Sequence, residues 1–464
     1  MNKLLKDKRT YFMIVLFGMI LWFAYLVIRY PIPPTKYILI GVVLIIIIVT
    51  LLFLSQYLSK NKMVQNIGKI IIVIISLFFL FINYFFSTTM EALLSNRYSL
   101  ETDNVLVIVK VSSPYYYTQD LAGKIYGTLE TQDDNIDKVL VKIEKENAEV
   151  ISPQTYSSII SLVKALLNNE VDCMVINESY RSLIEDEYPS FFDETRIIYS
   201  HQYISQSTSP EERNLCEESF NIYITGIDTY GAISSKSRSD VNIILTVNPI
   251  RKTILLTSIP RDFYIPFGIL NGKKEKLTHS GLYGVDETMQ NVASYFQIDI
   301  DYFVRVNFDS VIEIIDALGG IEVDNPQAFG NFQKGNIHLN GEEALAFSRE
   351  RYAFEQGDRE RGKNQMRVIT GMLDKMTSPA ILKNYKSLLD SLDETFQTNI
   401  SDEQIIELIR MQLNDMSSWH VEKNSVDGTG EMLYSPIYGS RLYMMVPDEK
   451  SVVEAKEKIL KLMQ

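Results

Sequence analysis

The sequence predicts a membrane-anchored α/β protein, in which a mixed sheet with flanking helices forms a larger extracellular domain beside a smaller α/β domain. Three observations favour this fold class. Three apolar runs come first, strand-like and helix-like segments alternate after them, and arginine and aspartate residues gather in the last third of the chain. We expect three N-terminal transmembrane helices in residues 1–90, the smaller accessory domain in 100–215 and the larger domain in 220–464.

Each apolar run is long enough to cross a bilayer. Tyr11–Ile28, Tyr37–Leu54 and Ile70–Phe86 contain no charged residue, and a helix rises ~1.5 Å per residue. No small-residue cleavage site follows the first run, which argues against a signal peptide. Lysine and arginine are concentrated before the first run and between the second and third runs. This asymmetry places the N-terminus in the cytoplasm and everything after Phe86 outside the cell.

Composition excludes one broad class of protein. The chain has 464 residues, a net charge of −13 and a pI near 5.0, whereas a general nucleic-acid binder is usually basic. Nucleic acid is therefore not an expected partner. Cys173 and Cys216 do not have the spacing of a metal site. Two unpaired thiols and one disulfide outside the membrane both fit the sequence.

The region after the apolar runs is typical of a small α/β domain. We expect strands at Val105–Val109, Val139–Ile143 and Val171–Ile176, and a helix at Ser157–Leu167. The region has no phosphate-binding loop or metal-ligand set, so a structural or partner-binding module is expected. Polar and charged residues at 204–219 indicate a linker to the next region.

The second soluble region mixes strands and helices. Its predicted strands are Ile222–Ile227, Val241–Val247 and Thr253–Ile259. Its predicted helices are Gly284–Phe296, Asp309–Leu318, one opened by a capping box at Ser401–Gln404, and Lys450–Met463. This mixture indicates an α/β or α+β domain.

A hairpin between the second and third of these strands would gather charged residues at one sheet edge. In that hairpin Asp240 falls opposite Pro260, so that Asp240 and Arg261 share the edge at which the first strand ends before Asp228. Arg238 lies in the loop between. The placement depends on the hairpin register, which a slip of one residue would change.

Two neighbouring aspartates suggest a divalent cation. Asp228 and Asp240 would repel each other when both are ionised, and Mg²⁺ or Mn²⁺ would relieve that repulsion while holding phosphate oxygens. The alternative for either residue is a strand-end cap or an Asp–Arg ion pair.

A second group of arginines follows about ninety residues later. Arg349, Arg351 and Arg359 precede Arg361 and Gln365, which lie four residues apart and would share one face if this segment is helical. Surface pairing with the acidic residues among them is the plainer interpretation. If they converge with Arg261, they make a clamp for a diphosphate, because guanidinium groups bind phosphate oxygens bidentately. An incoming hydroxyl could then attack phosphorus in line. His279 is either an assistant to that step or a structural histidine.

These motifs, in this order, resemble the LytR–CpsA–Psr family of cell-envelope proteins. The matching stretches are Gly226–Thr229, Arg238–Leu245, Ser258–Asp262, Lys276–Ser280, Asp316–Val323, Asn340–Arg351, Asp358-Arg359 and Arg361–Gln365. The match covers roughly residues 221–370. The three apolar runs and the additional outer domain resemble the capsule-associated CpsA branch. The sequence departs from the family in two places: Tyr230 stands where an arginine is frequent, and the stretch that is often His-Ala-Tyr is His279-Ser280-Gly281 here.

The resemblance implies a polyprenyl-diphosphate glycopolymer phosphotransferase. Such an enzyme moves a glycopolymer, here a capsular polysaccharide, from an undecaprenyl-diphosphate carrier onto peptidoglycan and leaves a phosphodiester link. The lipid tail would lie in an apolar channel. Asp228 and Asp240 would bind Mg²⁺ and, with Arg261, form the catalytic set. The diphosphate would contact Arg238, Arg261, Lys276, Arg349, Arg351, Arg361 and Gln365.

Other functions use the same residues. A polyprenyl-diphosphate hydrolase would place water where the acceptor hydroxyl goes. A non-enzymatic regulator of capsule genes is a further alternative, although the basic tail of about ten residues is too short for a DNA-binding fold. The expected partners are the lipid-linked polysaccharide, peptidoglycan and the bilayer, with capsule assembly proteins as candidates for the accessory domain.

Overall fold

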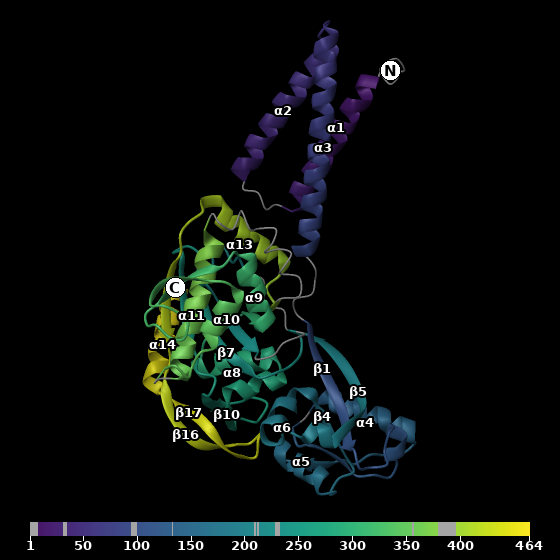
Figure 1. Ribbon diagram of the computed structural model, residues 1–464, viewed down its shortest axis with the longest axis vertical. Coiled ribbons are helices and arrows are strands. Elements are labelled where there is room, and N and C mark those ends of the chain that lie inside the picture. Colours follow the sequence, from purple (N-terminus) through teal and green to yellow (C-terminus); the bar gives the residue numbers. More distant parts are fainter. Residues whose placement is uncertain are drawn as a thin grey trace.

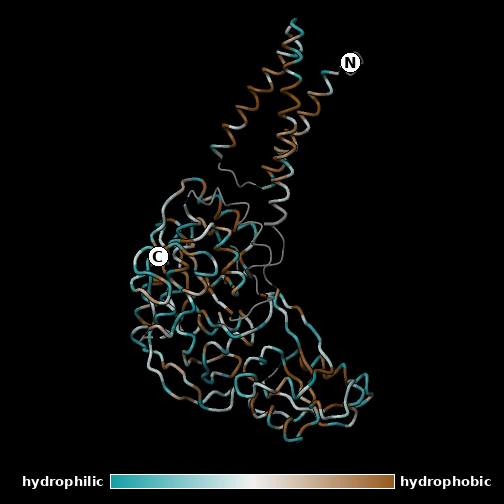
Figure 2. Tube along the Cα trace, in the orientation of Figure 1, coloured by the Kyte–Doolittle hydropathy of each residue, from teal (hydrophilic) through white to brown (hydrophobic). Residues whose placement is uncertain are grey.

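The computed structural model describes residues 8–30, 35–93, 100–131, 133–207, 210, 213–227, 233–354, 357–378 and 396–464. Three long apolar helices extend away from the rest of the molecule (Figures 1 and 2). They are α1 (Lys8–Arg29), α2 (Thr35–Tyr57) and α3 (Lys62–Leu93). All three are long and apolar enough to cross a membrane, with mean hydropathy of 2.4 to 3.3. The predicted apolar runs therefore form the predicted helices.

The first soluble region is built on a five-stranded sheet of order β3-β2-β4-β1-β5. Its strands are β1 (Leu100–Lys110), β2 (Tyr126–Leu129), β3 (Gln154–Tyr156), β4 (Cys173–Asn177) and β5 (Thr195–Gln206). Its helices are α4 (Asp134–Asn147), α5 (Ile159–Leu167), α6 (Arg181–Glu187) and α7 (Phe191–Glu194). This region lies at the end of the molecule away from α1–α3 (Figure 1).

Two expectations for this region are wrong. Val139–Ile143 lies in α4 and is not a strand. Asp133 caps that helix by accepting from the amides of Asn135 and Ile136, and the apolar residues then recur at helical spacing, which outweighs the β propensity of the valines. Residues 204–206, expected in the linker, are the end of β5, which pairs with β1 along its length.

The second soluble region holds a six-stranded sheet of order β14-β11-β6-β7-β8-β15. The strands are β6 (Phe220–Ile227), β7 (Ser239–Asn248), β8 (Thr253–Ser258), β11 (Tyr302–Val306), β14 (Phe396–Thr398) and β15 (His420–Ser425). Pairs β6–β11 and β8–β15 are parallel, while β6–β7, β7–β8 and β11–β14 are antiparallel. The sheet is therefore mixed, as the sequence predicts.

Helices cover both faces of this sheet. The helices are α8 (Val285–Phe296), α9 (Phe308–Ala317), α10 (Gly341–Arg349), α11 (Asp358–Thr377), α13 (Asp402–Asp415) and α14 (Glu449–Met463). Successive strand residues point to opposite faces: Ile222 and Ile243 pack with residues of α11 and α13, and Tyr223 and Ile244 pack with residues of α8 and α14. Both faces of the central strands are covered, so buried apolar residues of β6, β7 and β8 occur on both faces of the sheet.

Three hairpins and one 3₁₀ segment complete the region. The hairpins pair β9 (Tyr264–Pro266) with β10 (Lys274–Lys276), β12 (Ile321–Asn325) with β13 (Gly335–Leu339), and β16 (Gly428–Ser435) with β17 (Ser440–Pro447). The 3₁₀ segment Leu277–Tyr283 follows β10 directly. It brings the predicted Lys276–Ser280 stretch back to the start of β7.

The two soluble regions share one hydrophobic core. A single cluster of buried side chains includes Leu106 and Ile176 of the first sheet and Tyr223 and Phe303 of the second. The regions are also joined by a buried ion pair: Arg305 Nη1 on β11 lies 2.9 Å from Glu101 Oε1 on β1, and Arg305 is 2 % exposed. The domain boundaries expected above remain a prediction, because the two regions pack as a continuous body.

Candidate functional site

The pair formed by Asp240 and Arg261 lies at one edge of the second sheet. β7 and β8 form the expected hairpin, and Ile243 lies opposite Ser258. Continuing that register sets Asp240 opposite Arg261, so the predicted alignment with Pro260 is wrong by one residue. The register seen in the structure brings the two charges together, and Arg261 Nη1 donates to Asp240 Oδ1 at 2.7 Å. The turn at Asn248–Lys252 sets the register. The pattern of the strand residues does not determine the position of this turn to within one residue.

The two oxygens of the Asp240 carboxylate have different surroundings. Oδ1 accepts from Arg261 and also from Thr278 Oγ1 at 2.9 Å. Oδ2 is buried and has no hydrogen-bond partner among the described residues. Burial by itself raises the pKa of Asp240, but the Arg261 charge and hydrogen bond outweigh it and hold the pKa below its usual value. Asp240 therefore favours its ionised form, and one of its oxygens has no hydrogen-bond partner among the described residues.

Arg238 and Lys276 lie on one side of this pair, beside a small polar hollow of about 210 Å³. Arg238 immediately precedes β7, and its Nη1 lies 2.7 Å from Asp186 Oδ2 of α6. Lys276 ends β10, and its Nζ lies 2.8 Å from Asp262 Oδ1. Both Asp240 and Arg261 also line the hollow.

Arg349 and Arg351 come from the end of α10. Asn340 caps this helix and accepts from the Glu343 amide at 2.9 Å, while Glu343 Oε2 accepts from the Asn340 amide at 3.0 Å. This capping box defines the start of α10, and the helix ends at Arg349. The Arg349 guanidinium carbon lies 4.1 Å from the centre of the Phe308 ring, the first residue of α9.

Arg361 and Gln365 lie on α11, as the four-residue spacing predicts. The same face of α11 continues toward the C-terminus with apolar side chains at helical spacing, namely Val368, Ile369, Met372, Leu373 and Met376, and ends at Thr377. From Arg361 to Thr377 this face extends ~24 Å at ~1.5 Å per residue. It is polar at its start and apolar along the rest.

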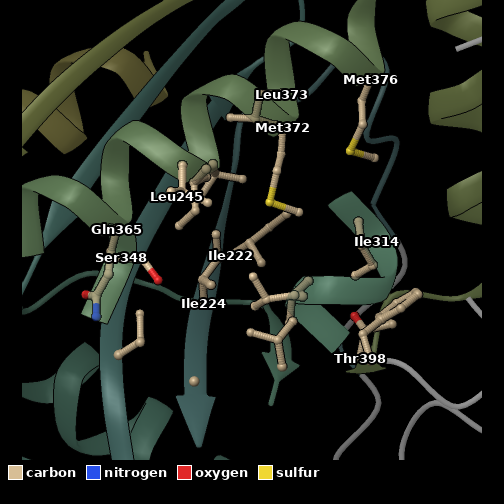
Figure 3. Close-up of a pocket in the computed structure, with 18 of the residues that line it drawn as sticks. Ile222, Ile224, Leu245, Ile314, Ser348, Gln365, Met372, Leu373, Met376 and Thr398 are labelled. Atoms are coloured by element: carbon tan, nitrogen blue, oxygen red, sulfur yellow. The ribbon is translucent and has the colours of Figure 1, made fainter. Parts of the chain in front are cut away.

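This face of α11 forms one wall of a cavity of about 970 Å³. The opposite wall is the sheet, with Ile222 and Ile224 of β6 and Leu245 of β7. Gln365 and Ser348 lie together at one end of the close-up, and Met376 lies toward the other (Figure 3). Phe85 and Phe86 of α3 and Trp419 also line the cavity, so it reaches the third membrane helix.

The large cavity and the polar hollow meet at Asp240 and Arg261, which line both. The predicted diphosphate-binding residues therefore divide into two groups. Arg349, Arg351, Arg361 and Gln365 line the cavity, whereas Arg238 and Lys276 line the hollow. Arg359 joins neither group, because it forms an exposed ion pair with Asp427 at 2.7 Å.

Only one of the two aspartates predicted to bind a metal lies among the described residues. Asp228 is outside the described residues. Within the described part of the chain, no group of three or more His, Cys, Asp or Glu side chains has the arrangement of a metal site. Asp240 nevertheless fits a two-carboxylate site, since its buried Oδ2 needs a partner and a hard cation prefers oxygen ligands.

His279 has a structural partner. It is 3 % exposed, and its Nδ1 lies 3.0 Å from Glu275 Oε1. The other Glu275 oxygen accepts from Ser435 Oγ at 2.7 Å. Burial favours a raised pKa for Glu275, but its hydrogen bond to His279 contributes to a pKa below the usual value. The imidazole ring also lines the hollow.

The two cysteines do not form a disulfide with each other. Cys173 and Cys216 are both free thiols.

Sequence reasoning missed two residues at the site. Thr278 stands within the Lys276–Ser280 stretch and was not assigned a role, although it donates to Asp240. Asp186 lies about fifty residues before Arg238 in a region with no recognisable motif, and it becomes a neighbour only through the packing of α6. Thr278 could have been found from its place between Lys276 and His279, whereas nothing in the sequence indicates Asp186.

Comparison with known proteins identifies the family. The model of the LytR_cpsA_psr family matches residues 193–460. A polyisoprenyl-teichoic acid–peptidoglycan teichoic acid transferase, TagV of Bacillus subtilis, is 31% identical over 284 residues, which cover 57% of this chain and 70% of the relative. The corresponding TagU of Enterococcus faecalis is 34% identical over 224 residues, covering 47% and 72%. The crystal structure of B. subtilis TagV covers 53% of this chain and 98% of its own, at 30% identity and a TM-score of 0.46.

Proposed function

The chain belongs to the LytR–CpsA–Psr family, and from that premise we propose that it transfers a glycopolymer from a polyprenyl-diphosphate carrier to peptidoglycan. The observation that carries the proposal is the junction of two spaces at Asp240 and Arg261. An elongated apolar cavity suits a lipid tail, and its polar end carries four arginines and a glutamine for the diphosphate. Relatives of this chain are named as transferases of lipid-linked teichoic acid to peptidoglycan.

In the proposed reaction, an acceptor hydroxyl on peptidoglycan attacks the phosphorus that carries the polymer. A bond forms between that phosphorus and the acceptor oxygen, and the bond from the same phosphorus to the bridging oxygen breaks. The polyprenyl phosphate leaves and takes the hydroxyl proton on a phosphate oxygen. Arg261, Arg349, Arg351 and Arg361 stabilise the negative charge that develops on the leaving phosphate.

In this proposal Asp240 orients the Arg261 side chain and does not act as a strong base. Its lowered pKa makes it a poor proton acceptor at neutral pH. Its carboxylate holds the Arg261 guanidinium in one orientation toward the diphosphate. Gln365 offers an uncharged donor at the same end of the cavity.

We propose that Mg²⁺ or Mn²⁺ binds to Asp240 Oδ2 together with Asp228. The support for this is the buried oxygen without a hydrogen-bond partner among the described residues. A bound divalent cation would supply positive charge at the diphosphate oxygens.

We further propose that the polymer is a capsular polysaccharide, the carrier is undecaprenyl diphosphate, and the soluble regions face the outside of the cell. The basic residues that flank the spans support the orientation. The capsule assignment follows the resemblance to the CpsA branch, while teichoic acid, named for the relatives, is the competing polymer. Supplying each lipid-linked polymer to the same preparation separates these substrates.

The test uses the full-length protein in vesicles with lipid-linked polymer, with and without peptidoglycan. We expect polymer on the peptidoglycan, and a loss of ~10²-fold or more for Arg261→Ala and Arg351→Ala, since one charge-stabilising donor contributes about that much. Arg359→Ala is the matched control, because Arg359 lies outside both spaces, and it should keep its activity. Release of free polymer without peptidoglycan would instead identify a hydrolase.

A further inference from the structure

The polar hollow beside Asp240 and Arg261 has a wall from the first soluble region. Leu183 and Asp186 of α6 line it together with Arg238, Lys276 and Tyr443 of the second region. Because α6 belongs to the region built on the five-stranded sheet, this wall comes from outside the sheet that carries the predicted site.

Several contacts fix α6 in that position. Asp186 Oδ2 accepts from Arg238 Nη1 at 2.7 Å. The next residue, Glu187, accepts from Tyr438 Oη at 3.1 Å. Leu183 is 1 % exposed and belongs to the core that both regions share. The carboxylate of Asp186 is thus held at the hollow, yet its side chain is 52 % exposed and can still accept hydrogen bonds.

The chemistry of the hollow suits a sugar ring. Its volume of about 210 Å³ has room for several waters and therefore accommodates one sugar ring. Each of the three cations there has an acidic partner, because Arg238 pairs with Asp186, Arg261 with Asp240 and Lys276 with Asp262. A neutral group with many hydroxyls therefore fits better than a second anion. Leu442 and Tyr443 add apolar surface for a ring face.

We propose that the hollow holds the sugar ring adjacent to the reacting phosphate, and that Asp186 is a specificity-determining residue for that ring. The proposal rests on the proposed transferase function. Asp186 accepts hydrogen bonds from ring hydroxyls and repels a ring that carries a carboxylate. The ring belongs either to the donor polymer or to the peptidoglycan acceptor, which have the same hydroxyl chemistry.

The experiment compares wild type with Asp186→Asn in the full-length protein. The control is Glu185→Gln, since Glu185 is exposed on the same helix and pairs only weakly with Arg181 at 3.5 Å. Three probes are measured for binding: a polyprenyl diphosphate without sugar, the same lipid with one neutral sugar, and the same lipid with one uronic acid. The KM for peptidoglycan is measured in parallel, and thermal unfolding verifies that each variant folds.

We expect Asp186→Asn to weaken binding of the neutral-sugar lipid ~10-fold, as expected for lost hydrogen bonds to a charged group. The protein should also discriminate less between the neutral-sugar lipid and the uronic-acid lipid. Binding of the sugar-free lipid should change less than ~2-fold. A ~10-fold rise in the KM for peptidoglycan, with donor binding unchanged, would also support the proposal and assign the ring to the acceptor.

Two results would overturn it. If all three lipids bind more tightly to Asp186→Asn by the same factor, Asp186 is only a counter-ion of Arg238. If neither binding nor KM changes, the hollow takes no sugar. If the proposed function itself is wrong, the wild-type protein transfers no polymer to peptidoglycan. The binding measurements with the three lipids do not depend on transfer, so the two failures can be distinguished.

Discussion

The Asp240 carboxylate illustrates how one side chain can serve both structure and chemistry. Its Oδ1 is held by Arg261 and Thr278, while Oδ2 is buried and has no hydrogen-bond partner among the residues described. A group whose pKa is lowered by folding stabilises the protein above its unfolded-state pKa, which is ~3.9 for aspartate. That stabilisation disappears as the pH falls through the lower, folded-state pKa.

We therefore expect Asp240→Asn to change the acid limb of stability. Between pH 7 and pH ~4 the wild type should be the more stable protein, and its advantage should shrink as the pH is lowered below ~4. Urea unfolding at a series of pH values measures this. Parallel stability curves down to pH 2 would contradict the assigned ion pair.

The buried pair of Arg305 and Glu101 gives a second prediction about single residues. Arg305→Ala leaves the Glu101 carboxylate buried without its guanidinium partner, so we expect a loss of ~3–5 kcal/mol in the free energy of unfolding. The control is Arg213→Ala, which removes a more exposed pair to Asp301 at 3.1 Å, with Arg213 29 % exposed. That variant should lose at most ~1 kcal/mol. Denaturant unfolding compares the two, and equal losses would contradict the prediction.

At the scale of elements, α11 decides the shape of the 970 Å³ cavity, which is proposed to hold the lipid tail. Met372→Trp adds volume on the face that lines the cavity, about three turns from Arg361. We expect weaker binding of a long-chain polyprenyl diphosphate, by ~10-fold, and little change for a short-chain analogue that does not reach that depth. Asp374→Trp, on the exposed face of the same helix, is the control. Fluorescence titration with both lipids measures the effect, and equal weakening would place the tail elsewhere.

Much of this architecture could be predicted from the sequence, because local patterns determine it. Strands β6, β7 and β8 and helices α8, α9, α13 and α14 lie where the periodicity and capping residues indicate. Val139–Ile143 was misread because β-branched residues also occupy the buried face of a capped helix. The hairpin register was wrong by one residue, since a run of apolar residues buried on both faces carries no alternation to fix it.

The site was harder to predict than the fold for a physical reason. Arginine and aspartate types indicate anion and cation binding, but only packing decides which of them share a space. The stripe from Val368 to Met376 looks in sequence like an ordinary core face, and it lines a cavity because the sheet and α9 stand away from it. Asp186 became a neighbour of Arg238 through contacts between two regions, which no local pattern encodes.

At the scale of the whole molecule, the proposed orientation in the membrane places two loops on opposite sides of the bilayer. Val150, which is 89 % exposed, should face outward, whereas Lys60, between α2 and α3, should face the cytoplasm. In a background with Cys173 and Cys216 replaced by serine, a membrane-impermeant maleimide should label Val150→Cys in intact cells. Lys60→Cys should be labelled only after permeabilisation, and the reverse pattern would invert the topology.

If the 970 Å³ cavity that borders Phe85 and Phe86 holds the carrier as proposed, its size has a consequence for the rate of turnover. Reactant and by-product share the same hydrocarbon chain, so most of the apolar contact that draws the carrier in is still present once the phosphodiester has formed. Departure of the spent carrier into the bilayer would then be slower than bond making. Such an enzyme would show a rapid first turnover, equal in amount to the protein present, followed by a slower steady rate.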